Sequence, residues 1–219
     1  MFGRESVEFN PIDVFLHLDV YLAQIIAQYG SWVYALLFAV IFVETGVVVM
    51  PFLPGDSLLF VAGMLAGGGH MNLYVLMGLL FTAAVLGDAV NYTIGRYFGH
   101  KLFANKDSKI FRQDYLQKTH AFYEKHGGKT IILARFVPIV RTFAPFVAGM
   151  AEMSYHRFVM FNLVGAAVWV VSLLYAGYFL GGIPFIAKNI GSIAIALVLI
   201  PAMPVVIEFC KMKFAKKEA

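Results

Sequence analysis

The sequence has few charged residues and almost no cysteine, and each shortage excludes a class of protein. Only 14% of the 219 residues are charged, whereas 60% are hydrophobic and the mean hydropathy is +0.76. Soluble domains carry about 25% charged residues, so we expect an integral membrane protein. The single cysteine, Cys210, excludes an internal disulfide framework and a cysteine-rich metal site. No two histidines have the spacing of metal ligands on a helix, so we expect neither a metal nor another cofactor.

Lysine and arginine are missing from a long part of the sequence. Residues 32–94 contain neither, whereas residues 95–129 hold eight of them and residues 211–219 hold four lysines. Cytoplasmic loops of membrane proteins carry the excess of lysine and arginine. We therefore expect a basic loop and helix over 97–129 and the C-terminal tail to lie in the cytoplasm. The N-terminal segment, residues 1–31, is acidic and contains a helix pattern suited to the membrane interface.

Three segments with few or no charges are long enough to cross a bilayer, which takes about 20 apolar residues. They cover residues 72–96, 156–183 and 189–210. The first contains Asp88 near its middle, whereas the other two contain no charge in their apolar parts. We therefore expect an all-α membrane domain over residues 32–210 with about three full transmembrane helices.

Two further apolar segments contain prolines and charges. Residues 32–66 are interrupted by Pro54, and residues 130–150 are interrupted by Pro138. Non-helical backbone at membrane depth is tolerated only where protein or water satisfies its polar groups. We interpret both segments as re-entrant hairpins with proline-containing tips, although residues 32–50 alone are also long enough for a tilted full span.

Three short motifs occur twice in the sequence, at an offset of 82 to 86 residues. They are Phe-Val-Ala-Gly-Met at 60–64 and 146–150, Phe-x-Pro at 52–54 and 136–138, and Gly-x-x-x-Gly at 95–99 and 177–181. Three features at nearly one offset indicate a duplication. An odd number of crossings between the copies would make the two hairpins enter from opposite faces, which is the inverted-repeat plan of many transporters.

Four charges fall inside the two predicted hairpins, namely Glu44, Asp56, Arg135 and Arg141. Insertion scales put a charge at the centre of a spanning helix at roughly 2.5–3.5 kcal/mol. The four side chains must therefore be paired, solvated or both. One interpretation is two structural ion pairs that join the hairpins. The other is a polar cavity within the membrane.

The chemistry of these four side chains indicates what such a cavity would bind. Arg135 and Arg141 lie six residues apart across the tip containing Pro138, so they can direct two planar guanidinium groups at one point. Guanidinium groups bind phosphate or carboxylate oxygens bidentately. Glu44 and Asp56 can pair with the arginines when the site is empty, and carboxylates can also take up protons. The pattern favours a site for an anionic head group.

Several other positions have less specific interpretations. Asp88 either faces the same cavity or caps a contact between helices. Asn162 is expected to join two helices by a hydrogen bond, and Trp169 is expected to pack within its span. Asp88, Asn162, Pro54 and Pro138 are candidates for a supporting layer around the charged groups.

Two runs around these charges are similar to the signatures of a known family. Residues Phe42–Gly46 and Pro51–Asp56 resemble its first signature, and Ala134–Thr142, continuing to Gly149 and Met150, resembles its second. The family is that of the DedA-type membrane proteins, whose shared unit is also called the VTT or SNARE-associated domain. The resemblance extends over most of the chain.

The resemblance implies a multi-pass protein of the bacterial inner membrane that supports envelope integrity. Members of the family are implicated in translocating polyprenyl phosphate carriers such as undecaprenyl phosphate, and eukaryotic relatives scramble phospholipids. Proton dependence is also attached to the family. Its functional acids and arginines correspond here to Glu44, Asp56, Arg135 and Arg141.

The leading hypothesis is therefore a lipid flippase rather than an enzyme. Arg135 and Arg141 would hold the phosphate, and Glu44 and Asp56 would pair with them and respond to protons. Its expected partners are a membrane lipid and protons, not nucleic acid, and assembly with further copies of the chain is left open.

Three alternatives remain at this point. A proton-coupled transporter of a small soluble ion or solute would use the same titratable acids. A membrane-embedded lipid-phosphate phosphatase would need a nucleophile or base, for which His126 and His156 are the nearest histidines in sequence. The charges could also serve a purely structural role.

Overall fold

The computed structural model is all-helical over the residues that it describes, which are 18–47, 55–103, 129–184 and 186, and it contains no strand there. The predicted all-α fold class is thus confirmed. The helices are α2 (Leu18–Tyr29), α3 (Trp32–Gly46), α4 (Gly55–Gly67), α5 (Leu73–Phe103), α7 (Lys129–Ala134), α8 (Pro138–Met150) and α9 (Tyr155–Leu180).

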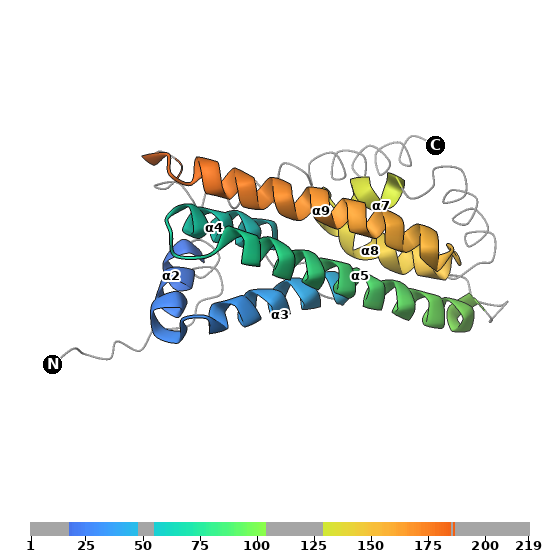
Figure 1. Ribbon diagram of the computed structural model, residues 1–219. Helices are drawn as coiled ribbons and strands as arrows, with labels where there is room; N and C mark the ends of the chain where they lie inside the picture. Colours follow the sequence, from blue (N-terminus) through green and yellow to red (C-terminus); the bar gives the residue numbers. More distant parts are fainter. Residues whose placement is uncertain (1–17, 48–54, 104–128, 185, 187–219) are drawn as a thin grey trace, which may run out of the picture.

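Two long helices, α5 and α9, form the frame of the molecule and run antiparallel side by side (Figure 1). Within the described residues, Leu73–Phe98 and Tyr155–Leu180 are the helices long and apolar enough to cross a membrane, with 26 residues each. At about 1.5 Å per residue, each is about 39 Å long, which exceeds the roughly 30 Å of hydrocarbon in a bilayer. Two predicted spans, 72–96 and 156–183, are therefore helices of spanning length. The third, 189–210, and most of the basic loop lie outside the described residues.

The distribution of polar and apolar side chains is that of a protein surrounded by lipid. Large apolar side chains are exposed along both long helices, among them Leu86 and Val90 on α5 and Val164 and Val168 on α9. Five charged side chains, in contrast, are buried between the helices. Soluble proteins rarely bury charges while exposing apolar helix faces.

The shorter helices pack against this frame in a regular way. Helix α3 lies along α5 and α4 lies along α9, while α8 lies along α5 and α7 along α9 (Figure 1). Helix α3 ends at Gly46 and α4 begins at Gly55, whereas α7 ends at Ala134 and α8 begins at Pro138. Proline suits a first helical position because it has no N–H to leave unpaired and its φ is already helical. The helix ends therefore fall within the two segments that the sequence predicts to be broken.

Four glycines let the short helices approach the long ones closely, and each lies against a backbone carbonyl of the helix it faces. The contacts are Gly63 with Leu174, Gly177 with Phe60, Gly149 with Tyr92 and Gly95 with Phe146. A Cβ on any of the four would lie 1.9–2.2 Å from the carbonyl oxygen, so no larger residue fits. The first two contacts join α4 to α9 and the last two join α8 to α5. Two of the three repeated motifs, Phe-Val-Ala-Gly-Met and Gly-x-x-x-Gly, thus make repeated contacts.

Helix α2 lies across the ends of α3 and α4 and falls within the acidic segment 1–31 (Figure 1). It ends at Tyr29 and is followed by Gly30, whose φ of +54° is the left-handed conformation that suits glycine after a helix. The Gly30 N–H donates to the Ile26 carbonyl at 2.8 Å. The chain then turns directly into α3.

Candidate functional site

Five charged side chains are buried where the ends of the short helices meet the middle of α5 and α9. Each of these residues is at most 9% exposed. They are Glu44 near the end of α3, Asp56 at the start of α4, Asp88 within α5, Arg135 between α7 and α8, and Arg141 in the first turn of α8. A buried charge is tolerated only when it is paired and hydrogen-bonded, so the partners of each group define the site.

The first group, which we call the Arg141 cluster, consists of Arg141, Glu44 and Asp56. Arg141 Nη1 donates to Asp56 Oδ1 at 2.7 Å, and Arg141 Nη2 donates to Glu44 Oε1. Asp56 lies in the first turn of α4, where the helix dipole favours a negative charge. A Cβ on Gly55 would overlap the Glu44 carboxylate, so a larger residue here would displace that carboxylate. One guanidinium thus ties α8 to α3 and α4.

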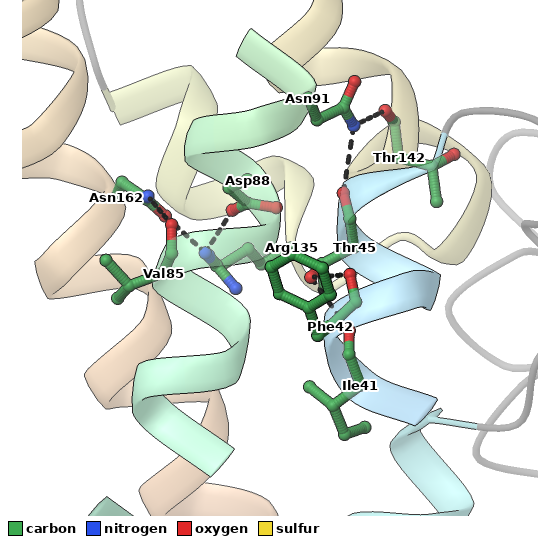
Figure 2. Close-up of polar contacts among 9 residues, drawn as sticks. All are labelled: Ile41, Phe42, Thr45, Val85, Asp88, Asn91, Arg135, Thr142 and Asn162. Atoms are coloured by element: carbon green, nitrogen blue, oxygen red, sulfur yellow. Dashed lines mark hydrogen bonds and ion pairs between the residues drawn. The ribbon is translucent and has the colours of Figure 1, made fainter. Parts of the chain in front are cut away.

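The second group, the Arg135 cluster, consists of Arg135, Asp88 and Asn162. Figure 2 shows Arg135 Nη2 donating to both Asp88 Oδ2 and Asn162 Oδ1. Asn162 Nδ2 in turn donates to the Val85 carbonyl at 3.1 Å. Asp88 therefore pairs with an arginine of the site and does not merely cap a contact between helices. Asn162 does join α9 to α5, as expected, but it also touches the arginine.

The two arginines pair with different carboxylates. The sequence does not predict which carboxylate pairs with which arginine. Arg141 holds the acids of α3 and α4, whereas Arg135 holds the acid of α5. Of the candidates for a supporting layer, Asp88 and Asn162 lie directly in the Arg135 cluster and Pro138 is the first residue of α8. Pro54 lies outside the described residues.

Asn91 connects the helix ends around the two clusters. Its Nδ2 donates to the Thr45 carbonyl at 3.0 Å and to the Thr142 carbonyl at 2.8 Å (Figure 2). It therefore ties the end of α3 and the start of α8 to α5. No motif pointed to this role. Its place one helical turn after Asp88, on the same face of α5, is the signal that would have indicated it.

Trp169 lies against both clusters, although the sequence suggested only a packing role. Its Nε1–H donates to Asp56 Oδ1 at 2.8 Å. The Arg141 Cζ lies 4.8 Å from the centroid of the Trp169 ring, and the Arg135 Cζ lies 5.9 Å from it. Both distances fall within the range of cation–π attraction.

Several donors of the two guanidinium groups are not used. Among the described residues, Arg135 Nε and Nη1 and Arg141 Nε are buried and have no hydrogen-bond partner. Buried donors are seldom left unpaired, because each costs the free energy of lost hydration. Such donors can donate to the oxygens of a phosphate or carboxylate in place of, or beside, the acids already present.

Comparison with known proteins places these residues in a wider context. The profile of the VTT domain matches residues 53–179. Protein DedA of Escherichia coli K12 is 58% identical over 210 residues, which cover 95% of this chain and 96% of that protein. The inner membrane protein YqjA of the same strain is 35% identical over 78% of this chain and 77% of its own length.

A third relative, an uncharacterized membrane protein of Mycobacterium leprae, is 45% identical over 77% of this chain and 75% of its own length. No solved structure matches the chain. The resemblance that the sequence signatures indicated is confirmed by these similarities. The matched residues 53–179 include Asp56, Asp88, Arg135 and Arg141, and Glu44 lies shortly before them.

Proposed function

The chain belongs to the VTT domain family of DedA-type membrane proteins, and from this premise we propose that it is a lipid transporter and not an enzyme. Its cargo would be an anionic lipid with a phosphate head group, undecaprenyl phosphate or a related lipid. It would carry this lipid across the bacterial inner membrane and so support the maintenance of the envelope. The relatives that are named membrane or inner membrane proteins are consistent with that location.

One observation carries the proposal. Two buried arginines, which lie beside the middle of two helices of spanning length, have donors without a hydrogen-bond partner among the described residues. A purely structural ion pair gains most when every donor is satisfied. Arg135 instead leaves two of its nitrogens unpaired among the described residues. Phosphate oxygens are acceptors that a guanidinium group binds bidentately.

The formal charges of the site support a role for protons. The two clusters together contain three carboxylates and two guanidinium groups. An anionic head group that joined them would add to an excess of negative charge. Protonation of one carboxylate would free part of an arginine and reduce the repulsion at the same time. We therefore infer that head-group binding is coupled to proton uptake, with Glu44 and Asp56 as the first candidates.

We further propose that the short helices form two re-entrant hairpins, α3 with α4 and α7 with α8, which enter from opposite membrane faces as an inverted repeat. The C-terminal tail would then lie in the cytoplasm. In this arrangement only the head group passes the charged clusters, while the lipid tail stays in the bilayer beside the hairpins. The matching glycine contacts of α4 with α9 and of α8 with α5 support the repeat.

The positions of the histidines favour transport over histidine-dependent hydrolysis. A phosphatase that used histidine as its nucleophile or base would need that histidine beside the arginines. His156 is exposed at the start of α9, and His126 lies outside the described residues. Among the described residues, the polar and aromatic groups that contact the arginines are carboxylates, the Asn162 amide and the Trp169 ring.

The test is the movement of a phosphate lipid between leaflets of vesicles that contain the purified protein. We expect Arg141→Ala and Arg135→Lys each to lower the initial rate at least about tenfold, because each removes a bidentate contact worth about 1.5–3 kcal/mol. Arg157→Ala, which removes an exposed arginine at the start of α9, is the matched control and should transport normally.

Normal rates in both arginine variants would remove the arginines from the mechanism. Uptake of a water-soluble anion along a pH gradient, without lipid movement, would favour the alternative of a soluble-solute transporter. Release of phosphate from the lipid would favour an enzyme.

A further inference from the structure

Trp169 on α9 lies in contact with groups of both charged clusters. Its side chain is 1% exposed, its N–H donates to Asp56, and its ring lies 4.8 Å and 5.9 Å from the Cζ atoms of Arg141 and Arg135. No ion pair between the described residues connects the Arg141 cluster with the Arg135 cluster. The indole is therefore a physical link between two groups that are otherwise paired separately.

The contacts of Trp169 are more specific than those of a packing residue. Asp56 Oδ1 accepts hydrogen bonds from both Trp169 Nε1 and Arg141 Nη1. A leucine or phenylalanine, both smaller and without a donor, would leave that bond unmade. The ring face carries negative charge density and attracts the guanidinium groups.

The position of Trp169 on α9 explains why it reaches both clusters. It follows Asn162 by seven residues, so both side chains lie on the same face of the helix. Gly165 lies between them on this face, and the Arg135 side chain occupies the space that a larger residue would fill, with Nε 3.1 Å from the position of a Cβ. Helix α9 thus presents an amide, a gap for an arginine and an indole in succession.

We propose that Trp169 is a positioning residue that couples the two arginines. When a phosphate binds one arginine, the indole ring moves, and this movement shifts the other arginine. This inference rests on the proposed function of the site. A phosphate that draws Arg141 away from Asp56 changes the acceptor that Arg141 and Trp169 share. The indole then moves with Asp56, and the ring against which Arg135 lies moves with it.

The sequence offers a direct spectroscopic readout, because the chain contains two tryptophans, Trp32 and Trp169. Trp32 is 75% exposed at the start of α3. In the Trp32→Phe protein, all tryptophan fluorescence comes from Trp169. The full-length variant would be placed in phosphatidylcholine vesicles and compared with the same vesicles containing phosphatidic acid, whose head group is a bare phosphate.

We expect phosphatidic acid to change the Trp169 emission, and we expect Arg135→Lys and Arg141→Lys each to abolish at least half of this change. A response that depends on Arg141 alone would overturn the coupling, even if the protein transports lipid. A protein that shows the coupled response but moves no lipid would contradict the proposed function and leave the coupling standing. The two failures are therefore distinguishable.

Substitution of Trp169 itself provides the second measurement. We expect Trp169→Phe, which keeps a ring but loses the donor, to lower the initial transport rate about tenfold, as expected for a lost hydrogen bond to a charged group. Trp169→Leu, which loses ring and donor, should lower it further. Equal rates in the wild type and both variants, with unchanged helix content, would show that Trp169 only packs.

Discussion

The two arginine clusters differ in how fully their charges are satisfied. Arg141 is paired with two carboxylates, Glu44 and Asp56, which come from the ends of two helices. Arg135 is paired with one carboxylate, Asp88, and one amide, Asn162. One Arg141 nitrogen is unpaired among the described residues, whereas two Arg135 nitrogens are.

This difference suggests a division of labour within the site. The Arg141 cluster holds the ends of α3, α4 and α8 together and carries an excess of negative charge. The Arg135 cluster is formally neutral and keeps more of its donors unpaired. A head group would therefore meet Arg135 first, and it would reach Arg141 only after a carboxylate of that cluster had been neutralised.

Removal of Arg141 should have the largest effect on stability. Arg141→Ala leaves Glu44 and Asp56 buried side by side without a cation, and breaking a buried pair in this way costs about 3–5 kcal/mol. We expect a loss of this size in the free energy of unfolding, measured by denaturant titration in detergent micelles. Arg157→Ala is the exposed control and should change it by less than about 0.5 kcal/mol. A small loss for Arg141→Ala would mean that the acids are hydrated rather than held by the arginine.

The corresponding change in the other cluster should cost less. Asp88→Asn removes the single carboxylate that Arg135 contacts, but Asn162 still accepts a hydrogen bond from it. We expect about 2 kcal/mol, because the ion pair is replaced by a hydrogen bond to an uncharged amide while the guanidinium stays buried.

A double-mutant cycle tests this pairing. The Asp88→Asn and Arg135→Gln double variant should be less destabilised than the sum of the single variants. Additive losses would mean that the pair does not interact in the folded protein. The same micelle titration supplies all four free energies of the cycle.

The sequence predicted where the helices end and which charged residues form the site. It predicted less well which of these residues pair with one another. Gly46, Gly55 and Pro138 lie at helix boundaries because glycine and proline interrupt helices, and this can be read directly from their positions. Burial of Glu44, Asp56, Arg135 and Arg141 together follows from the cost of isolated charges in lipid.

The division into two clusters depends on how far each helix is rotated about its axis, and no pattern of residue types specifies that rotation. For the same reason, the sequence does not predict the contacts of Trp169 and Asn91. A tryptophan within an apolar span is usually a packing residue, and only the three-dimensional structure shows that its N–H points at Asp56. For Asn91, the acceptors are backbone carbonyls of α3 and α8, which carry no signature in the sequence.

Glu44→Gln would make the Arg141 cluster resemble the Arg135 cluster, with one carboxylate and one amide. The shape of the side chain is retained, so we expect a loss of only about 1 kcal/mol in the free energy of unfolding. The pH dependence of lipid transport should weaken, because one group that can take up a proton is gone. Initial rates measured across a pH series would check this. An unchanged pH profile would assign proton uptake to Asp56 or Asp88 instead.

Asn162→Asp would do the reverse and give Arg135 two carboxylates, as Arg141 has. The new carboxylate strengthens the bond with Arg135 but loses the amide that donates to the Val85 carbonyl. Because these changes oppose each other, we expect the free energy of unfolding to change by less than about 1 kcal/mol. Transport should nevertheless slow, since a phosphate must now compete with two acids for Arg135. A variant that is equally stable but slower would show that the incomplete pairing of Arg135 serves binding, whereas an unchanged rate would show that it does not.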